Sequence, residues 1–306
     1  MHRIISLIPS ATEIICALGF EDCLVGRSHE CDYPLSVQRL PVCTEPKIDT
    51  NATSVEIDHR IKAILEKALS VYKVDVDKLK ELQPTLIVTQ SQCEVCAVSL
   101  KDVEKAVCEF VESKPHIVSL ESSTIADILK DILNVSSALD VPKRGKDFIR
   151  KMQLSMRYIE NKSRKLPKLT IGCIEWIEPL MAAGNWVPEL VEMAGGKNLF
   201  GTAGKHSPWI KLEEFMKEDP DLIVIMPCGF DIKKTLEEMQ TLTKKKIWAK
   251  LKAVKNCNVY VVDGNQYFNR PGPRIVDSLK ILAEIFHPRE FNFGYANKGW
   301  KKYIWS

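Results

Sequence analysis

The chain has 306 residues, of which 45% are hydrophobic and 27% are charged. This composition excludes a disordered or fibrous protein, and the length is sufficient for about two globular domains. With 43 Lys and Arg against 40 Asp and Glu, the net charge of +3 gives no large basic surplus of the kind that binds nucleic acid or an anionic membrane. No segment approaches the ~18 consecutive apolar residues of a membrane helix, so we do not expect a membrane-embedded protein. The expected partner is a small ligand or another protein.

The N-terminal part of the sequence predicts strands that alternate with helices. Residues 3–9 form a short apolar run closed by a proline, which is typical of a buried strand in a parallel sheet. This alternation predicts an α/β fold. Further strands are predicted at 24–26, 85–89 and 116–120, and helices at 10–19 and 76–83.

The stretch 141–166 is polar, charged and almost free of strand-forming residues. Within it, Phe148, Met152, Met156 and Ile159 recur at spacings of four, four and three, which gives one apolar stripe on a helix. A helix of about 24 residues would span ~36 Å. Such a helix suits a rigid connection between two lobes, because a flexible linker would be rich in Gly, Ser or Pro.

The second half of the chain repeats the plan of the first. Asp219 and Pro220 precede the apolar run 222–224 in the same way that Gln83 and Pro84 precede 86–88. We therefore predict two similar α/β lobes with central parallel sheets, joined by one long rigid helix, with a ligand cleft between the lobes. The predicted domains are 1–140, 141–166 and 167–306. A strand is predicted at 169–174, a late strand at 258–264 and a closing helix at 274–286, whereas the basic and aromatic tail 292–306 has no predicted structure.

Motifs of nucleotide binding and covalent hydrolysis are missing from the sequence. Neither glycine-rich phosphate loop occurs, and residues 201–206 only imitate one, because their glycines are three residues apart instead of five. The nucleophile elbow of hydrolases is also missing. The sequence therefore indicates neither a nucleotide-binding protein nor a hydrolase of this kind.

The ten cysteines are dilute and scattered, which favours free thiols in a reducing compartment over a disulfide framework. Cys16 and Cys173 fall in apolar segments and are expected in the core. A second interpretation is a zinc or iron site, because Cys93 and Cys96 have the spacing of a half-site. The residues that could complete it are His29, Cys31, His206 and Cys228. Plain structural cysteines and hydrogen-bonded loop histidines are the alternative, and a redox dithiol is disfavoured because the surrounding pattern of a thioredoxin-like unit is missing.

Polar, aromatic and thiol residues gather just after the predicted strands, where ligands bind in open α/β sheets. Trp176, Trp186 and Trp209 stand beside Pro, Gly or Asn in predicted turns, where an indole can meet a flat, partly apolar ligand. Packing of loops against the lobes is the alternative for these three residues. Arg270 and Arg274 can contact an acidic or amide group of a ligand or cap the lobe.

Four segments carry a family resemblance: RIISLIPSATEIICALGFEDCLVGRS, LQPTLIVTQ, SPWIKLEEFMKEDPDLIVIMPCG and VYVVDGNQYFNRPGPRIVDSLKILAEIF. In this order they resemble the class III periplasmic binding proteins, and most closely the cobalamin-binding proteins of ABC importers. The resemblance covers the chain from His2 to Pro288. It implies a binding protein that is not an enzyme, with two lobes on a rigid helix and with cobalamin or another metal chelate held by aromatic packing and few hydrogen bonds.

The resemblance also assigns roles to residues. Trp209 matches a position whose indole packs on the ligand, Gln90 faces the cleft from the first lobe, and Tyr267 with Phe268 forms the opposite wall. Importer relatives dock to their permease through one acidic residue on each lobe, which here implies Glu213 and either Asp75 or Asp77. The full set of expected ligand-binding residues is Gln90, Trp176, Asn185, Trp186, Trp209, Tyr267, Phe268, Asn269 and Arg270.

Two features depart from the importer pattern. The sequence opens inside its first strand, so the expectation is a cytoplasmic relative, or a periplasmic or extracellular protein if the true start lies upstream. The thiol-rich segments are also foreign to that pattern. The alternative function is therefore a cytoplasmic metal-dependent or thiol-dependent protein that uses zinc, iron, haem or a siderophore chelate in the Cys/His-rich cleft.

Overall fold

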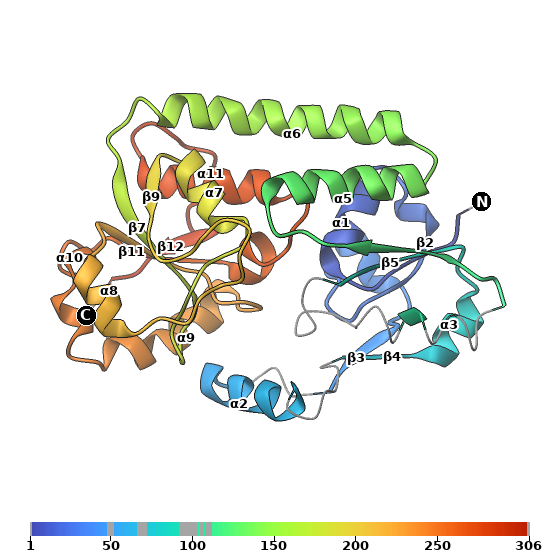
Figure 1. Ribbon diagram of the computed structural model, residues 1–306, viewed down its shortest axis with the longest axis horizontal. Coiled ribbons are helices and arrows are strands. Elements are labelled where there is room, and N and C mark those ends of the chain that lie inside the picture. The colour runs from blue at the N-terminus through green and yellow to red at the C-terminus, as the bar shows by residue number, and fades with distance from the viewer. Residues whose placement is uncertain are drawn as a thin grey trace. The chain divides into compact units, whose positions relative to one another are not determined.

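The structure is a computed structural model that describes residues 2–47, 52–65, 72–91, 103–104, 107 and 112–304 (Figure 1). The chain divides into two compact units. The first unit comprises Met1–Ala52, Glu56–Ser122 and Ala126–Lys151, and the second comprises Thr53–Val55, Ser123–Ile125 and Met152–Ser306.

A parallel four-stranded sheet with the order β2-β1-β5-β6 forms the centre of the first unit. The predicted apolar strands are confirmed, because every residue of β1 and β5 is buried. A separate antiparallel pair, β3 with β4, was not predicted. The strands are β1 (Ile4–Ser6), β2 (Leu24–Arg27), β3 (Thr44–Pro46), β4 (Tyr72–Val74), β5 (Leu86–Gln90) and β6 (His116–Leu120), and the helices are α1 (Pro9–Ala17), α2 (Ser54–Leu65), α3 (Val76–Leu82) and α5 (Ile125–Ala138).

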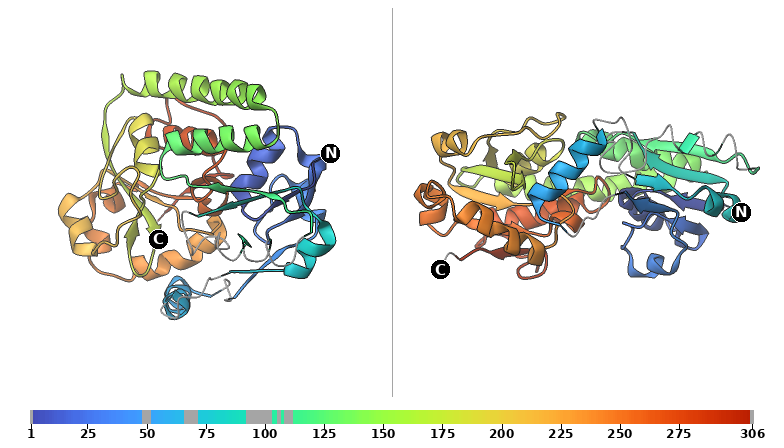
Figure 2. Two further views of the ribbon diagram at one scale, coloured as in Figure 1. Left: turned by 45° about the vertical axis from the view of Figure 1, so that its right-hand side comes forward. Right: turned by 90° about the horizontal axis from the view of Figure 1, so that it is seen from below.

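In the second unit, β9, β7, β10 and β11 run parallel in that order. Two antiparallel strands extend this sheet: β8 pairs with the end of β7, and β12 pairs with β11. Figure 2 shows residues 169–302, coloured from yellow-green to red, from two further directions. The strands are β7 (Leu169–Trp176), β8 (Met181–Ala182), β9 (Gly196–Asn198), β10 (Leu222–Ile225), β11 (Val259–Val262) and β12 (Trp300–Lys302). The helices are α7 (Val187–Met193), α8 (Leu212–Glu218), α9 (Ile232–Thr243), α10 (Lys252–Lys255) and α11 (Ile275–Phe286).

The predicted internal repeat is confirmed by the strand orders, because β2-β1-β5-β6 corresponds to β9-β7-β10-β11. The helices α1 and α7, which follow the first strand of each sheet, are succeeded by Gly19 (φ +78°) and Gly195 (φ +88°). These left-handed conformations favour glycine after a helix. The seven-residue helices α3 and α8 both end at a left-handed residue, Gln83 (φ 40°) and Asp219 (φ 41°), and a proline follows each.

Each unit has its own hydrophobic core. In the second unit, Phe215 of α8 and Trp248 are completely buried against strand residues such as Ile223. Burial of a large apolar side chain contributes about 1.5–3 kcal/mol. Gly172 in β7 makes room for this packing, since a Cβ atom there would lie 2.3 Å from Cζ of Phe215.

The predicted connecting helix is α6 (Pro142–Ser163), one continuous helix of 22 residues. Met152, Met156 and Ile159 of the predicted apolar stripe are buried, and Phe148 is partly buried. The stripe therefore anchors α6 as the helical spacing predicts. Among the described residues, we find no helix with the length and hydropathy to span a membrane.

Candidate functional site

In both sheets the chain connections change direction between the two middle strands, β1 and β5 in the first unit and β7 and β10 in the second. In open α/β sheets, ligands bind at this switch point, outside the carboxyl ends of the strands. Gln90 is the last residue of β5, and Trp176 is the last residue of β7. The predicted ligand-binding residues therefore lie at two carboxyl edges, which we describe unit by unit.

At the edge of the second unit, the backbone holds Trp209 in place. Trp209 forms an isolated antiparallel bridge with Met181, and Met181 is paired with Trp176 at the end of β7. The amide of Ala182 also donates to the carbonyl of Pro208 at 2.9 Å. Although its backbone is fixed, the Trp209 side chain is 54% exposed, whereas that of Trp176 is 8% exposed. Trp209 is thus an exposed indole on an ordered backbone.

The aromatic row continues from Trp176 to Phe230, which follows β10. The two ring centroids are 5.3 Å apart, and the amide of Asn265 donates to the carbonyl of Phe230 at 3.0 Å. Asn265 is the second residue of the π-helical turn Gly264–Phe268, which presents Tyr267. The expected set of ligand-binding residues includes neither Met181 nor Phe230. An apolar residue directly after a Pro-Cys-Gly turn was the available signal for Phe230.

The π-helical turn Gly264–Phe268 separates two residues that were predicted to act together. Tyr267 is half-buried, but Phe268 is only 1% exposed and packs in the core. Phe268 therefore supports the wall from beneath, which corrects the expectation that both rings line it. The side chain of Asp263 caps the turn by accepting from the amide of Gln266 at 2.8 Å, and desolvation raises the pKa of Asp263.

The side chain of Asn269 helps to close this turn. Its Nδ2 donates to the carbonyl of Gly264 at 2.8 Å. The expectation that the Asn269 amide also serves a ligand stays a prediction.

Two buried arginines brace the same turn. Arg274 donates from Nη1 to Oε1 of Gln266 at 3.1 Å, and its guanidinium carbon lies 5.4 Å from the ring centroid of Tyr267. Arg270 donates from Nη2 to Oδ1 of Asn265 at 3.1 Å. A guanidinium over an aromatic face is a favourable contact. These contacts match the alternative that both arginines cap the lobe. They also place positive charge behind the ring of Tyr267.

A carboxylate at the end of β7 fixes the loop that contains Asn185 and Trp186. Ser207 Oγ donates to Oε2 of Glu175 at 2.8 Å and accepts from the amide of Gly184 at 3.0 Å. Burial raises the pKa of Glu175, and the hydrogen bond from Ser207 opposes this effect. Asn185 itself has a left-handed backbone (φ 51°), and Trp186 is buried. Trp186 therefore packs beneath the loop instead of standing out from it as Trp209 does.

In the first unit, His29 follows β2 and is held by Thr44. Its Nδ1 lies 2.7 Å from Thr44 Oγ1, and its ring centroid lies 5.1 Å from that of Tyr72. Tyr72 donates its hydroxyl to Oε1 of Glu30 at 2.7 Å. Burial lowers the pKa of His29, so the imidazole is neutral at pH 7. A neutral imidazole whose Nδ1 is engaged can coordinate a metal through Nε2. Gln90 is buried at the neighbouring strand end.

Four of the six proposed metal ligands lie among the described residues, and they form no cation site there. No group of three or more His, Cys, Asp or Glu residues is arranged to hold a metal among the described residues. Cys93 and Cys96 lie outside those residues. Cys31 is buried, with Thr12 Oγ1 3.0 Å from its Sγ, whereas His206 is exposed and Cys228 is half-buried.

The expectation of cysteines without disulfide bonds is confirmed for six of the described cysteines. Burial raises the pKa of Cys43 to about 12 and also raises the pKa of Cys173, which is buried in β7 as predicted. Cys16 is only half-buried, and burial raises its pKa to about 12. The cysteines that form no disulfide are Cys16, Cys23, Cys43, Cys173, Cys228 and Cys257.

The two acidic residues expected to contact a permease occupy equivalent places in the repeat. Asp77 is the second residue of α3, and Glu213 is the second residue of α8. Both side chains are exposed. Asp75 is the N-cap of α3 and accepts from the amide of Lys78 at 3.0 Å, so Asp77 is the better match of the two.

Comparison with known proteins agrees with this architecture. Residues 4–265 match the family described as periplasmic binding protein. A vitamin B12-binding protein from Vibrio vulnificus (strain CMCP6) is 23% identical over 292 residues, which cover 94% of this chain and 90% of that relative. The uncharacterized ABC transporter substrate-binding lipoprotein YvrC from Bacillus subtilis (strain 168) is 24% identical over 299 residues, which cover 94% of this chain and 81% of that relative.

A solved structure gives the same fold. The periplasmic heme-binding protein RhuT from Roseiflexus sp. RS-1, in its apo form, aligns with a TM-score of 0.70 at 19% identity and covers 94% of this chain and 98% of its own. The family match extends over most of both units, and the repeated sheets and the single long helix α6 agree with it. The chain therefore belongs to the class III periplasmic binding proteins.

Proposed function

We propose that this protein is the ligand-binding component of an ABC importer and that it captures cobalamin or a related corrinoid. The observation that carries the proposal is Trp209, an exposed indole whose backbone is fixed at the carboxyl edge of a parallel sheet. The relative from Vibrio vulnificus, whose name states vitamin B12 binding, supports the choice of ligand.

A flat macrocycle suits the aromatic edge of the second unit. Trp209, Trp176 and Phe230 follow one another along this edge, and Tyr267 stands on the next turn. Aromatic side chains bury about 150–250 Å² each, and the backbone contacts of Trp209 reduce the ordering cost of binding. Capture by burial of a ring face therefore requires few hydrogen bonds.

The polar periphery and the metal of such a ligand have candidate partners as well. Gln90 in the first unit and Asn185 in the second supply side-chain amides that can pair with carboxamides of a corrin. The neutral imidazole of His29 supplies a nitrogen donor for the metal. With the buried arginines behind Tyr267, the site also tolerates an anionic substituent.

Docking to a permease through Asp77 and Glu213 completes the proposed function. The two residues hold equivalent positions in α3 and α8, so a pseudosymmetric partner with two basic patches would contact them in the same way. The relative YvrC, named as an ABC transporter substrate-binding lipoprotein, supports this partner class.

Ligand identity is tested by titrating the reduced chain with hydroxocobalamin under anaerobic conditions, then desalting it and recording an absorption spectrum. We expect corrin absorbance to elute with the protein. A shift of the visible bands that disappears in His29→Ala would identify His29 as the axial donor. Haemin is titrated in parallel, because a structural neighbour binds haem. If haemin binds tightly and the protein titrated with cobalamin elutes colourless, the proposal of a corrinoid ligand is wrong. The proposal that the aromatic edge binds a flat macrocycle would still stand.

A further inference from the structure

Helix α6 concentrates positive charge to a degree that the whole-chain charge conceals. Residues 142–168 contain ten Lys or Arg and two Asp or Glu, whereas the remaining chain contains 33 and 38. The excess of positive over negative charge is therefore confined to this helix and the five residues that follow it. A local patch of this kind determines electrostatic attraction to a surface even when the net charge of the chain is small.

The charges share the side of the helix that is turned away from the core. The α6 outer face consists of Lys143, Arg150, Lys151, Leu154, Arg157 and Tyr158. These residues recur at spacings of three, four and seven, so they lie along one side of the helix. Leu154 is 60% exposed and Tyr158 is 62% exposed, which places an aliphatic and an aromatic side chain among the cations.

Most of these cations are not neutralised by the protein itself. Among the described residues, Lys143, Lys151 and Arg157 form no ion pair, and Arg150 has only a long contact of 4.0 Å with Asp147. By contrast, Arg164 and Lys162, beyond the outer face, are paired with Glu160 and Glu290. The positive charge of the outer face is thus available to a partner.

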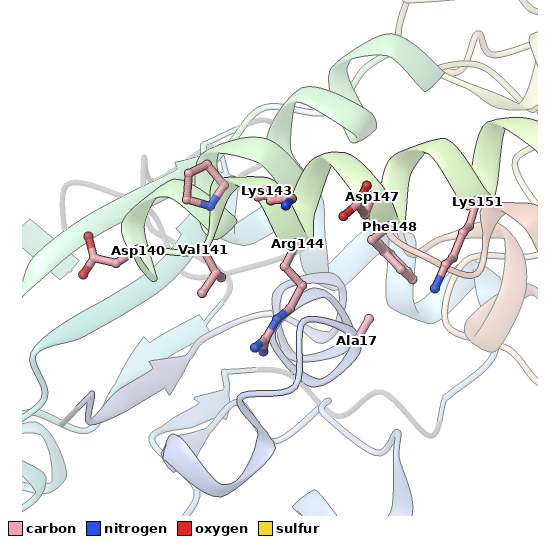
Figure 3. A pocket seen from close by; sticks show the side chains of 9 residues that line it. Ala17, Asp140, Val141, Lys143, Arg144, Asp147, Phe148 and Lys151 are labelled. Atoms are coloured by element: carbon pink, nitrogen blue, oxygen red, sulfur yellow. The ribbon is translucent and has the colours of Figure 1, made fainter.

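A hollow of about 620 Å³ opens beside the first turns of α6. Figure 3 shows Arg144, Phe148 and Lys151 projecting from α6 on the side of Ala17. Asp140 and Asp147 also line the hollow. Its walls combine the cations Lys143, Arg144 and Lys151 with two carboxylates and with apolar groups, and Arg144 donates to the carbonyl of Leu18 at 2.6 Å. Lys143 and Lys151 are therefore the cations of this hollow that can receive a phosphate headgroup.

From these features we propose that the α6 outer face docks on an anionic lipid bilayer. The apolar stripe of α6 is buried in the protein, so the contact with a bilayer is electrostatic: the cations meet lipid phosphates, and the exposed side chains of Leu154 and Tyr158 enter the headgroup region. Nucleic acid would use the cations but would gain nothing from exposed Leu154. The inference is independent of the ligand proposed above, because it involves no residue of the two carboxyl edges.

Vesicle sedimentation tests the proposal on the full chain. The vesicles consist of phosphatidylcholine alone or of phosphatidylcholine and phosphatidylglycerol in equal amounts, at low and high salt. We expect binding only to the anionic vesicles, weakened by salt. The double variant R150E/R157E should bind at least about 20-fold more weakly, because each lost cation near such a surface accounts for roughly five-fold and the two introduced carboxylates are repelled in addition. The variant L154S/Y158S should bind several-fold more weakly without any change in charge.

The matched control is K217E/K250E, which changes the net charge equally at two exposed lysines of other elements. It should bind as the unmodified chain does, and circular dichroism should show that all variants are folded. Equal losses in R150E/R157E and K217E/K250E would overturn the proposal, because attraction would then follow net charge alone. Absence of vesicle binding would overturn it too. Tighter binding of a DNA duplex through Arg150 and Arg157 would instead assign the face to nucleic acid.

Discussion

The carboxylate of Glu284 in α11 accepts a hydrogen bond of 2.8 Å from the indole Nε1 of Trp300 in β12. The same carboxylate accepts from the amide of Tyr295 at 3.2 Å and from the amide of Phe293. Glu284 is 3% exposed. One buried carboxylate thus ties the C-terminal tail to the second unit and places Tyr295 edge-on to Tyr267, with ring centroids 5.8 Å apart.

Replacing Glu284 with Gln should therefore destabilise the tail. The amide group of Gln has only one acceptor oxygen, and its NH₂ faces donors, so at least one buried donor loses its partner. We expect the free energy of unfolding to fall by about 1–3 kcal/mol, measured by urea denaturation. Glu290→Gln is the control, because Glu290 is half-exposed and its ion pair with Lys162 contributes little. Equal effects of the two substitutions would contradict the assigned role.

Removing the exposed indole should weaken ligand capture without unfolding the protein. Trp209→Ala takes away an aromatic anchor whose backbone is already fixed, and we expect hydroxocobalamin affinity to fall by about 2–3 kcal/mol, on the order of 30- to 150-fold, by fluorescence or absorbance titration. Trp209→Phe should recover part of the loss because it keeps an aromatic face.

The control for this experiment is Tyr158→Ala, which removes another exposed aromatic side chain from α6. Its affinity for hydroxocobalamin should equal that of the unmodified chain. An unchanged affinity in Trp209→Ala would refute the placement of the ligand at this edge.

Glu175 should make stability depend on pH in a defined direction. Burial raises the pKa of Glu175 above its usual value of 4.5, so the native state keeps a proton at pH values where the unfolded chain has released it. The resulting stabilisation is complete below the unfolded pKa and is lost as the pH rises through the native pKa. Glu175→Gln cannot titrate, so the unfolding free energy of the unmodified chain minus that of the variant should decrease from about pH 4.5 upward.

Denaturation curves recorded at several pH values measure this difference. Glu218→Gln, at the exposed end of α8, serves as the comparison and should give a difference that is nearly constant over the same range. A constant difference for Glu175→Gln as well would show that its carboxyl is not desolvated.

Local patterns in the sequence were enough to predict the repeated sheets and α6. Short apolar runs after Pro84 and Pro220 fix two equivalent strands, and the stripe that includes Met152 and Met156 fixes the buried side of the long helix, because both signals depend only on neighbours along the chain. The pair β3 and β4 has no such signal, because each strand has only three residues and a long segment of chain separates the two strands.

The details of the site depended on contacts between residues whose proximity no spacing reveals. The π-helical turn decides that Tyr267 is accessible and Phe268 is buried, and it engages the amide of Asn269 with Gly264. Similarly, the tail is ordered by Glu284, sixteen residues before Trp300. Hydrogen bonds of this kind follow from the folded backbone and cannot be read from residue type alone.

The equivalence of Asp77 and Glu213 leads to a prediction about transport. Reversing both charges in D77K/E213K should leave cobalamin affinity unchanged, because neither residue belongs to a carboxyl edge, but should abolish uptake of radiolabelled cobalamin in cells that depend on this chain and its permease. Loss of one contact in E213K should reduce uptake to an intermediate level, as expected for two separate charge contacts. The control, Glu218→Lys, places the same charge change at the other end of α8 and should transport normally. Normal uptake by D77K/E213K would exclude these acids as docking points, since reversed charges directly opposite basic residues cannot be tolerated without loss of binding.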